Sequence, residues 1–427
     1  MKVLVIGYGP GGVAAATAAR AFDSKAEITI VTEEEIPAHK KPGATMVLEY
    51  GDTSELNIRE WNRETLAAKR INLITGASVV GGNLRKNELE LKPRKGETQK
   101  LQYDRLIIAT GGKPSIPSIP GVDLPFVYTI QTAADTMKIT NELSSVNSVA
   151  VVGAGFSGLE AAERLHKIGK DVHLIIRSRL MRRLLEPPMS DDLLTRISRG
   201  IHIHLGEAPS AVLGDSRATG IQLGEKVLPT DAVLILTGVK PNTKLAEKIG
   251  FKPGSLGGIP VNKQMETEVK GVYAVGDCAE MSDFLTGKPI LMPVGSTAAR
   301  AGRQAGVSAV GGTKVYKDTF LRLQYDRIFG TDIVCIGHSS VTASAHGMST
   351  EVEYLEDQFE SMKVALVTSL DGRLIGGQVI ASRMGARVGY EIMDRIDQGL
   401  SLRDSPLTKG RHDRLLELLE RNLGPIQ

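Results

Sequence analysis

One pattern occurs twice in this chain of 427 residues, and it leaves few folds open. Each copy is a short apolar run followed by three glycines in the spacing G-x-G-x-x-G. The first run, Val3 to Ile6, precedes Gly7, Gly9 and Gly12; the second, Ser148 to Val152, precedes Gly153, Gly155 and Gly158. A continuous apolar run is typical of a parallel strand that is buried on both faces. Each copy therefore predicts a strand that enters a phosphate-binding turn.

The three glycines of the first copy have different tasks in such a turn. Gly7 allows the tight turn, Gly9 lets a pyrophosphate approach the backbone, and Gly12 lets the next helix pack close to the strand. The N–H groups at the start of that helix then point at the anion. Because the glycines stand between a strand and a helix, they predict a dinucleotide site and not a glycine-rich turn that binds nothing.

Both copies continue as a complete dinucleotide-binding unit. After the first, Ala14 to Phe22 is expected to be helical and Ala26 to Val31 a second strand. Glu33 lies about twenty residues beyond the turn, where a carboxylate can accept the ribose hydroxyl groups. After the second copy, a helix over Leu159 to Ile168 and a strand over Asp171 to Ile176 repeat the order. Two units in one chain imply two nucleotide cofactors that exchange electrons.

Length, composition and charge limit the remaining classes of function. A chain of this size should hold two or three domains. Its formal net charge of +3 favours neither a nucleic-acid partner nor a membrane surface. Without an uninterrupted stretch of about eighteen apolar residues, a cytoplasmic protein is expected. Cys278 and Cys335 are too few for a disulfide framework, and neither they nor the eight histidines show the spacing of metal ligands, so no metal site is expected.

The first unit is expected to resume after the second one. A buried strand over Leu106 to Ala109 leads to a backbone turn at Thr110 to Gly112, and a short strand over Val272 to Val275 ends next to Asp277. Ligands of open α/β sheets bind at the carboxyl ends of the strands, so Asp277 is a candidate contact. Pro293 to Val310 is expected to be a helix of small residues that docks beneath a cofactor.

The last hundred or so residues change character. Asp371-Gly372 is a strong hairpin signal between two strands, Met362 to Ser369 and Leu374 to Ala381. Arg387 to Gly399 and His412 to Leu423 are expected to be amphipathic helices. This pattern indicates a separate α+β domain, which we interpret as an interface module and not as a second catalytic unit.

Four motifs stand in a familiar order: GYGPGG from Gly7, ATGGKPSIPSIPG from Ala109, GAGFSGLE from Gly153 and YAVGDCAE from Tyr273. Over nearly the whole chain they resemble the two-dinucleotide-binding-domain flavoproteins, the pyridine nucleotide-disulfide oxidoreductases. The length and the C-terminal domain most resemble the branch of NADH oxidase and coenzyme A-disulfide reductase. The resemblance implies an α/β fold class with two Rossmann-like dinucleotide-binding domains, arranged as in glutathione reductase, and a C-terminal α+β dimerisation domain.

The resemblance also implies a division of the chain and a homodimer. It assigns residues 1–112 and 250–312 to an FAD-binding domain, 113–249 to an NAD(P)-binding domain and 313–427 to the dimerisation domain. Asp277 is implied to hydrogen-bond the flavin ribityl chain or pyrophosphate, and Glu160 to lie near the nicotinamide. On the flavin side Thr32 could align in place of Glu33. The predicted contacts of FAD and NAD(P)H are Gly7, Gly9, Gly12, Glu33, Pro42, Val80, Thr110, Gly111, Gly153, Gly155, Gly158, Arg177, Arg179, Gly238, Asp277, Thr297 and Ala298.

One departure from the family concerns the redox cysteine. Members that reduce disulfides or peroxide carry this cysteine at the flavin, in the segment that corresponds to Lys40 to Met46; here the segment reads KKPGATM. A thiolate forms the charge-transfer or mixed-disulfide intermediate, and neither Pro42 nor Ala44 can replace it. Disulfide reduction is therefore disfavoured, and Cys278 and Cys335 are expected to be structural thiols.

A second departure concerns the choice of nicotinamide cofactor. Where an NAD-specific site offers a carboxylate to the ribose, this chain has Ile176 followed by Arg177, Ser178 and Arg179. Paired guanidinium groups favour a 2′-phosphate, and a carboxylate would repel it. NADPH is therefore the preferred cofactor in this interpretation. The alternative is a solvated basic face formed by these arginines together with Arg182 and Arg183.

The expected reaction is hydride transfer from nicotinamide C4 to flavin N5, which needs stacked rings more than an acid or a base. Lys40 and Lys41 are expected near the flavin, where they would stabilise its anionic reduced form, unless they are solvated surface residues. The first hypothesis is an NAD(P)H oxidase or diaphorase that reduces oxygen or a small acceptor. The alternatives are a reductase of a rubredoxin- or ferredoxin-type carrier protein and a flavin-binding interaction protein whose redox state reports NADPH levels.

Overall fold

Five parallel strands build the first unit of the protein around the N-terminal glycine pattern. A computed structural model describes residues 1–35, 41–56, 58–316, 320–357 and 361–399. The strands of this sheet are, in spatial order, β19 (Val272–Ala274), β7 (Arg105–Ile108), β1 (Lys2–Ile6), β2 (Glu27–Val31) and β3 (Ile71–Ile74). The strands predicted near Val3, Leu106 and Val272 are confirmed as β1, β7 and β19. Although β19 follows the second unit in the sequence, it pairs with β7 of the first unit.

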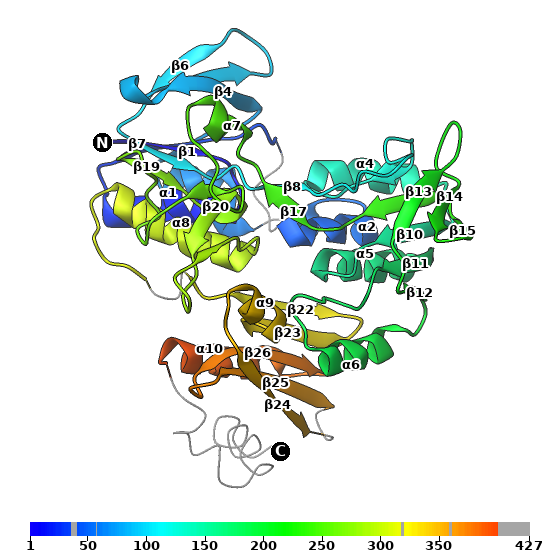
Figure 1. Cartoon of the computed structure of the whole chain (residues 1–427). Coiled ribbons are helices and arrows are strands. Elements are labelled where there is room, and N and C mark those ends of the chain that lie inside the picture. Colours follow the sequence, from blue (N-terminus) through cyan, green and yellow to red (C-terminus); the bar gives the residue numbers. More distant parts are fainter. Residues whose placement is uncertain (36–40, 57, 317–319, 358–360, 400–427) are drawn as a thin grey trace.

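Two helices of small residues cover this sheet. They are α1 (Pro10–Phe22) and α8 (Gly295–Ala309), which lie side by side in Figure 1. A Cβ on Gly302 would lie 2.1 Å from the carbonyl oxygen of Gly11, and one on Gly306 equally close to that of Ala15. The two backbones can approach this closely only because these positions are glycines. The predicted helix over Pro293 to Val310 is thereby confirmed, and it packs against α1.

A second parallel sheet forms the second unit. Its strands are, in spatial order, β12 (His202–Leu205), β11 (Asp171–Ile176), β10 (Ser148–Val152), β16 (Ala232–Ile235) and β9 (Val127–Tyr128). Its helices are α4 (Ala133–Leu143), α5 (Phe156–Lys167) and α6 (Pro187–Ile197). The short α7 (Lys244–Lys248) lies after β16 in the sequence but packs against β4 (Ala77–Asn83) beside the first unit. The strand, glycine turn and helix order predicted from the second G-x-G-x-x-G copy is confirmed.

Smaller sheets lie beside the two units. Antiparallel sheets are formed by β4–β5–β6 (Ala77–Asn83, Glu88–Pro93, Gln99–Gln102) and by β13–β14–β15 (Pro209–Leu213, Gly220–Leu223, Lys226–Pro229). A mixed sheet is formed by β18–β20–β21 (Ile259–Pro260, Ala279–Ser282, Pro289–Ile290), in which β18 is parallel and β21 antiparallel to β20. The two chain segments that cross between the units pair with each other as β8 (Gly112–Pro114) and β17 (Val239–Pro241). These crossings hold the two units on either side of one opening.

The segment before residue 50 departs from the first unit. A 3₁₀ turn, η1 (Lys41–Thr45), leads into α2 (Met46–Tyr50), which packs against α4 and α5 of the second unit. Leu48 is buried in the core of that unit. Shorter helical pieces follow at Ser54–Leu56, Arg59–Trp61 and, as α3, at Arg63–Ala68. Residues 41–50 therefore connect the first unit to the second.

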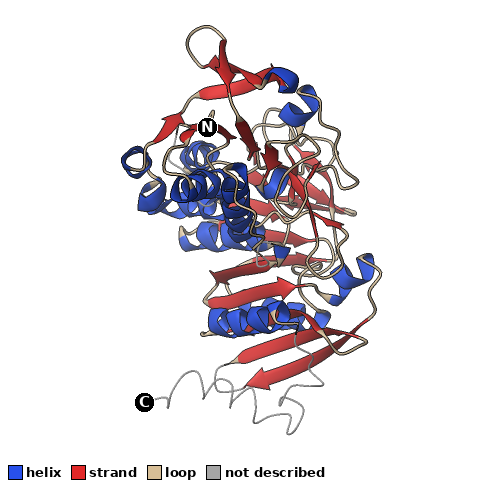
Figure 2. Ribbon diagram, turned by 90° about the vertical axis from the view of Figure 1, so that its left-hand side faces the viewer, coloured by secondary structure: helices blue, strands red, loops and turns tan. Residues whose placement is uncertain are grey.

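The C-terminal unit is an antiparallel sheet with a helix across one face (Figure 2). The strands are, in spatial order, β22 (Leu323–Ile328), β23 (Thr331–Gly337), β26 (Leu374–Ala381), β25 (Met362–Ser369) and β24 (Thr350–Asp357). The helix is α10 (Gly385–Asp397), and the short α9 (Ser340–Ala345) follows β23. The hairpin at Asp371-Gly372 and the helix near Arg387 are confirmed. His412 to Leu423 lies outside the described residues.

In the part of the chain that the structure describes, no helix combines the length and the apolar composition that crossing a bilayer requires.

Candidate functional site

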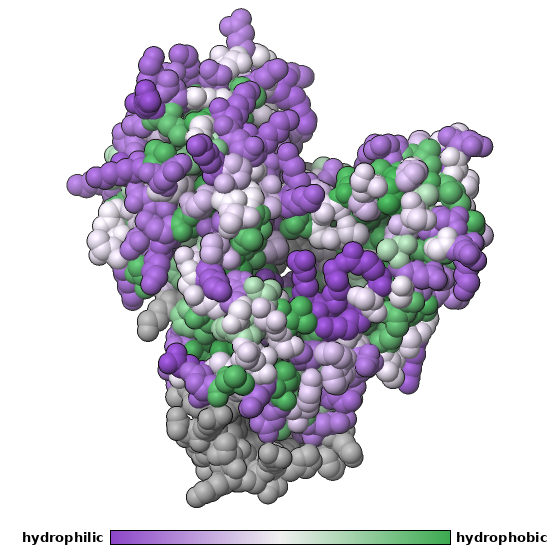
Figure 3. Space-filling view, in the orientation of Figure 1, coloured by the Kyte–Doolittle hydropathy of each residue, from purple (hydrophilic) through white to green (hydrophobic). Residues whose placement is uncertain are grey.

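A large cleft opens between the first and second units, with the C-terminal unit along one side. Its volume is about 2300 Å³. The carboxyl ends of β1 and β10 both reach it, as do the glycine turns that follow them. Figure 3 shows the surface hollowed between these two units, with hydrophilic residues along the rim. The cleft is where open α/β sheets bind their ligands.

The first glycine turn has the geometry of a phosphate-binding loop. Gly7 has φ +114°, and a Cβ there would lie 2.2 Å from the carbonyl oxygen of Ala109. A Cβ on Gly12 would lie 2.1 Å from the carbonyl oxygen of Gly7, so this glycine permits the contact between helix and strand. Apart from its own neighbours in the chain, no described atom lies within 4 Å of the Cβ position of Gly9, which lines the cleft. The start of α1 is thus open to an anion.

The second glycine turn has nearly the same backbone dihedral angles as the first. Gly155 has φ −86° and ψ −176°, against φ −82° and ψ −176° for Gly9. Gly153 has φ +120°, and a Cβ on Gly158 would lie 2.0 Å from the carbonyl oxygen of Gly153. Like Gly9, Gly155 lines the cleft with no described atom within 4 Å of its Cβ position. Two turns of equivalent geometry therefore open on one space.

The structure brings most of the predicted contacts together. Those that line the cleft are Gly7, Gly9, Glu33, Val80, Thr110, Gly111, Gly153, Gly155, Arg177, Arg179, Gly238, Asp277 and Ala298. Gly12 and Gly158 lie behind the turns, in the helix contacts given above. Thr297 is fully buried, and its hydroxyl group accepts a hydrogen bond from Arg300 (3.3 Å). The backbones of Lys41 and Pro42 are in η1, but their side chains lie outside the described residues.

At the end of β2, the structure separates the two candidates for the ribose contact. Glu33 is exposed on the cleft, and its Oε2 accepts a hydrogen bond from Ser78 Oγ at 3.0 Å. Thr32 is buried, and its Oγ1 accepts from the backbone N–H of Glu34 at 3.2 Å. Both residues line the cleft, and Glu33 presents the carboxylate.

Both cysteines are buried. Cys278 lies in the 3₁₀ turn η5 (Gly276–Cys278), and its Sγ donates to the carbonyl oxygen of Val275 at 3.3 Å. Burial raises the pKa of the Cys278 thiol. Cys335 lies within β23, and burial raises its pKa to about 12. The prediction that Cys335 is a core thiol is confirmed, and neither residue lines the cleft.

Beneath the cleft, the structure places Thr45 and Glu160 in contact. Thr45 Oγ1 donates to Oε2 of Glu160 at 3.3 Å, and Thr45 also lines the cleft. Glu160 is only 6% exposed. Burial, and next a hydrogen bond with Asp326 of β22, raise the pKa of Glu160 well above its ordinary value. Glu160 therefore keeps its proton to higher pH than an exposed glutamate does.

The loop after β11 brings four arginines to the cleft: Arg177, Arg179, Arg182 and Arg183. Arg179 donates to the backbone carbonyl groups of Leu185 and, at 2.9 Å, of Arg182, so it shapes the loop as well as lining the cleft. Burial and the charges of the other three arginines lower the pKa of Arg182. An anion bound among these residues would relieve that repulsion.

Sequence reasoning missed one wall of the cleft. It is formed by the C-terminal unit, through Arg322, Gln324, His338, Thr342 and His346. These residues belong to the region interpreted as an interface module, and no motif marks them. Only the placement of β22 and α9 beside the other two units shows that they face the same space (Figure 1).

Comparisons with known proteins agree with this architecture. The family model described as Pyridine nucleotide-disulphide oxidoreductase matches residues 1–305. The chain is 28% identical over 415 residues to an NADH oxidase of Methanocaldococcus jannaschii, covering 93% of this chain and 90% of that one. It is 30% identical over 417 residues to the NAD(P)H sulfur oxidoreductase (CoA-dependent) of Pyrococcus furiosus, covering 94% and 91%.

Among solved structures, the NAD-dependent persulfide reductase from A. fulgidus is similar with a TM-score of 0.87 and 26% identity. The similarity covers 94% of this chain and 78% of that one. The family match covers well over half of the chain and includes both glycine turns. The protein therefore belongs to the pyridine nucleotide-disulphide oxidoreductase family.

Proposed function

We propose that the protein is an FAD-dependent NAD(P)H oxidoreductase of the oxidase or diaphorase type, which reduces oxygen or a small acceptor without a redox-active cysteine. The observation that carries the proposal is the pair of equivalent turns, at Gly9 and Gly155, that open on one cleft. One nucleotide at each turn would bring two cofactors into a single space. Family membership and the NADH oxidase relative support the same activity.

The residues at the first turn fit FAD. Open space in front of Gly9 and the start of α1 would receive a pyrophosphate, and the exposed Glu33 would receive the adenosine ribose. Asp277, at the end of β19, would hold the ribityl chain or the pyrophosphate. When bound, FAD supplies a group that takes a hydride from reduced nicotinamide and passes the electrons on.

The chain itself supplies orientation and a proton. Overall, NAD(P)H, one proton and an oxidised acceptor give NAD(P)⁺ and an acceptor reduced by two electrons, so the acceptor needs a proton source. The carboxyl group of Glu160, whose pKa is raised chiefly by burial, contacts Thr45, where we expect the nicotinamide to lie, and in this proposal it would be that proton source. In this proposal Lys41 would add a positive charge that stabilises the anionic reduced flavin.

We propose NADPH as the preferred donor of electrons. Arg177, Arg182 and Arg183 line the cleft at the end of β11, where the ribose bound at the second turn would lie. No carboxylate follows that strand until Glu186. A 2′-phosphate would bind among the guanidinium groups with charge-assisted hydrogen bonds, whereas NADH offers only hydroxyl groups.

A reductase of a carrier protein is the second candidate. Rhodocoxin reductase of Rhodococcus erythropolis is 30% identical over 283 residues, which is 65% of each chain. The segment from Lys40 to Met46 contains no cysteine. This absence is as compatible with an enzyme that passes single electrons to a carrier protein as with an oxidase. The rate at which air reoxidises the reduced protein distinguishes the two candidates.

We further propose that residues 313–427 mediate a homodimer. Four large apolar or aromatic side chains of the C-terminal unit are at least 46% exposed: Tyr325, Tyr354, Leu370 and Tyr390. Burial of such side chains against a second copy would be favourable. Sedimentation equilibrium tests this proposal, since a monomer at micromolar concentration would contradict it.

Anaerobic titration of the purified protein with NADPH and with NADH tests the main proposal. Bleaching of the yellow flavin absorption by NADPH, followed by rapid reoxidation in air, supports the oxidase. Slow reoxidation that a ferredoxin- or rubredoxin-type carrier accelerates supports the second candidate. If the carrier has no effect either, a redox-sensing role gains support. Colourless protein that takes up no flavin on reconstitution would contradict all three.

A further inference from the structure

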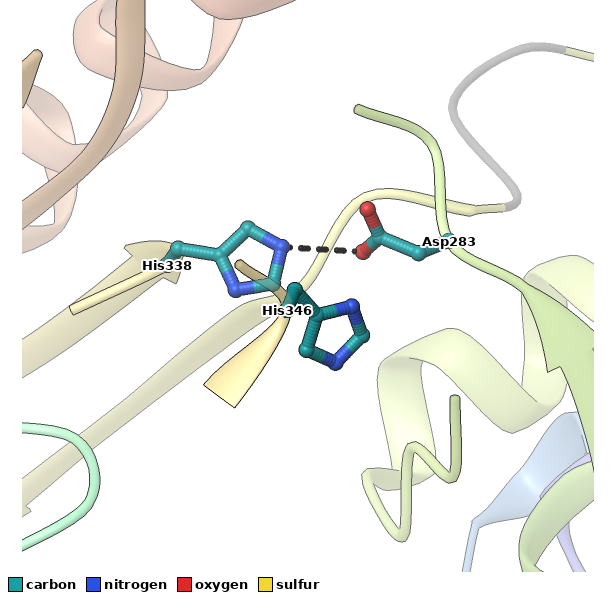
Figure 4. Close-up of side chains that lie close together, drawn as sticks. All are labelled: Asp283, His338 and His346. Atoms are coloured by element: carbon teal, nitrogen blue, oxygen red, sulfur yellow. Dashed lines mark hydrogen bonds and ion pairs between the residues drawn. The ribbon is translucent and has the colours of Figure 1, made fainter. Parts of the chain in front are cut away.

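We propose that Asp283, His338 and His346 form a binding site for a divalent transition metal of the zinc class (Figure 4). Asp283 lies in the turn after β20, whereas His338 and His346 flank α9. Each residue offers one ligand atom, and the three atoms lie within 4.8 Å of one another. The sequence predicted no metal site because 55 residues separate Asp283 from His338, and only the fold brings them together.

The contact between His338 and Asp283 has the spacing of two ligands on one metal ion. Nε2 of His338 lies 3.1 Å from Oδ2 of Asp283. Two ligands on a tetrahedral ion with bonds of about 2.0–2.1 Å lie roughly 3.3 Å apart, so a metal ion could replace the shared proton with little movement. Both side chains are buried, at 3% and 6% exposure, which limits the competition from bulk water.

The remaining polar atoms of these two ligands are held by neighbours. Nδ1 of His338 is 3.1 Å from Oγ1 of Thr342. Oδ1 of Asp283 accepts from the backbone N–H groups of Leu285 (3.1 Å) and Thr286 (2.7 Å). Such outer contacts fix the orientation of metal ligands, and here they turn Nε2 and Oδ2 towards each other.

His346 supplies the third ligand from the other end of α9. Its ring centroid lies 5.1 Å from that of His338, and Figure 4 shows the ring beside the hydrogen-bonded pair. Nδ1 of His346 is 3.2 Å from Oγ1 of Thr286, which also donates to Asp283 at 2.8 Å. Coordination through Nδ1 would replace the contact with Thr286. Because both histidines line the cleft, a fourth coordination position would face it.

The charges around the site decide which metal suits it. Two neutral imidazoles and one carboxylate favour Zn²⁺, Co²⁺ or Ni²⁺ over Mg²⁺ and Ca²⁺, which prefer oxygen ligands. Arg322 lines the same wall and interacts electrostatically with Asp283, and Nζ of Lys288 donates to the carbonyl oxygen of His346 at 2.6 Å. Their positive charges oppose a free cation but favour an anionic fourth ligand. Removal of the Arg322 charge should therefore tighten metal binding.

A second histidine cluster provides the matched control. His173 stacks on His202 with a centroid distance of 4.8 Å, and its Nδ1 lies 3.1 Å from Nε2 of His204. Asp171 contacts both His173 and His202. This cluster lies at the β11–β12 edge of the second unit and is not part of the cleft lining. A substitution in this cluster tests whether the metal binds wherever histidines lie close together.

The test is titration of the chelator-treated flavoprotein with Zn²⁺ by calorimetry and with Co²⁺ by its visible absorption. We expect one ion per chain. His338→Gln and Asp283→Asn should each weaken binding at least about 100-fold, because each removes a ligand. His202→Gln should leave the affinity unchanged, and Arg322→Gln should raise it.

Unfolding temperature and flavin content check the fold of each variant, and the less buried His346→Gln replaces His338→Gln if that variant does not fold. Absence of binding to the wild-type protein would overturn the proposal and leave Asp283 and His338 as a hydrogen-bonded pair. So would equal affinities of the wild-type protein and His338→Gln, or loss of binding in His202→Gln.

Discussion

The hydroxyl group of Thr45 lies 3.3 Å from the buried carboxyl group of Glu160, and this contact joins η1 to the helix that follows the second glycine turn. Glu160 also hydrogen-bonds Asp326 of the C-terminal unit. The carboxyl group therefore sits where all three units meet. Its raised pKa has consequences for both stability and turnover.

Replacement of Glu160 by glutamine should remove a pH dependence of stability. The pKa of Glu160 is higher in the folded protein than the ordinary value of 4.5, so the folded state keeps a proton that the unfolded chain loses. Its contribution is fully present below pH 4.5 and falls by about 1.4 kcal/mol per pH unit as the pH rises towards the folded pKa. The difference in unfolding free energy between wild type and Glu160→Gln should decline over this window.

Urea unfolding of both proteins at a series of pH values measures this difference. Asp326→Asn is the control, because loss of the neighbouring carboxylate should lower the pKa of Glu160 and end the decline at lower pH. Parallel pH curves for the wild-type protein and Glu160→Gln would show that Glu160 ionises normally.

The two open glycines should separate the binding of the two cofactors. A Cβ on Gly9 or on Gly155 meets no described atom within 4 Å, so alanine at either position fits the fold and obstructs only a bound phosphate. Gly9→Ala should lower the flavin content and leave the affinity for NAD(P)H of the remaining holoprotein within about threefold. Gly155→Ala should do the reverse, with normal flavin content and a KM for NAD(P)H raised about tenfold or more.

Gly7→Ala is the contrasting variant. Its Cβ would lie 2.2 Å from the carbonyl oxygen of Ala109, at φ +114°, so the fold itself must shift. We expect a loss of roughly 2–4 kcal/mol of stability in Gly7→Ala and almost none in Gly9→Ala. Flavin content and denaturation midpoints give both results, and a wild-type flavin content in Gly9→Ala would argue against FAD at the first turn.

Local patterns predicted the parts of this protein that local geometry determines. The strand before Gly7, the helix after it and their repeats near Gly153 were predictable because positive φ angles and close helix contacts require glycine at fixed spacings. The Asp371-Gly372 hairpin was predictable for the same reason: its turn closes with a 2.8 Å hydrogen bond between Ser369 and Gly372.

Contacts between distant segments were not predictable. The pairing of Glu160 with Thr45 and Asp326, and the approach of His338 to Asp283, join residues that are 55 to 166 positions apart. No periodicity or motif records such a contact, because it depends on how completed units pack together. The sequence did not predict that the C-terminal unit forms a wall of the cleft, because this also depends on how the units pack together.

Arg177 should determine the choice between NADPH and NADH. One charge-assisted hydrogen bond to a phosphate contributes about 1.5–3 kcal/mol, so Arg177→Ala should raise KM for NADPH roughly 10- to 100-fold and change KM for NADH less than about threefold. Arg199→Ala is the matched control, since Arg199 is exposed and does not line the cleft. Equal losses with both nucleotides would place Arg177 outside the 2′-phosphate site.

Glu186 should hold the C-terminal unit against the second unit. It is 2% exposed, and its carboxylate accepts hydrogen bonds from the backbone N–H (2.7 Å) and the hydroxyl group (2.6 Å) of Ser340 and from Gln378 (3.2 Å). Glu186→Ala leaves the buried Gln378 and the half-buried Ser340 without this acceptor. A destabilisation of about 2–4 kcal/mol is expected, measured by urea unfolding.

Two variants show whether this loss comes from the buried contact. Glu186→Gln keeps one acceptor oxygen for Ser340 and should cost only about 1–2 kcal/mol. Glu225→Ala removes a carboxylate from the exposed turn between β14 and β15 and should change stability by less than about 0.5 kcal/mol. If Glu186→Ala is as stable as Glu225→Ala, the contacts with Ser340 and Gln378 do not hold the units together. A destabilised Glu186→Ala with normal flavin content would instead show that the C-terminal wall can loosen while the first unit keeps its cofactor.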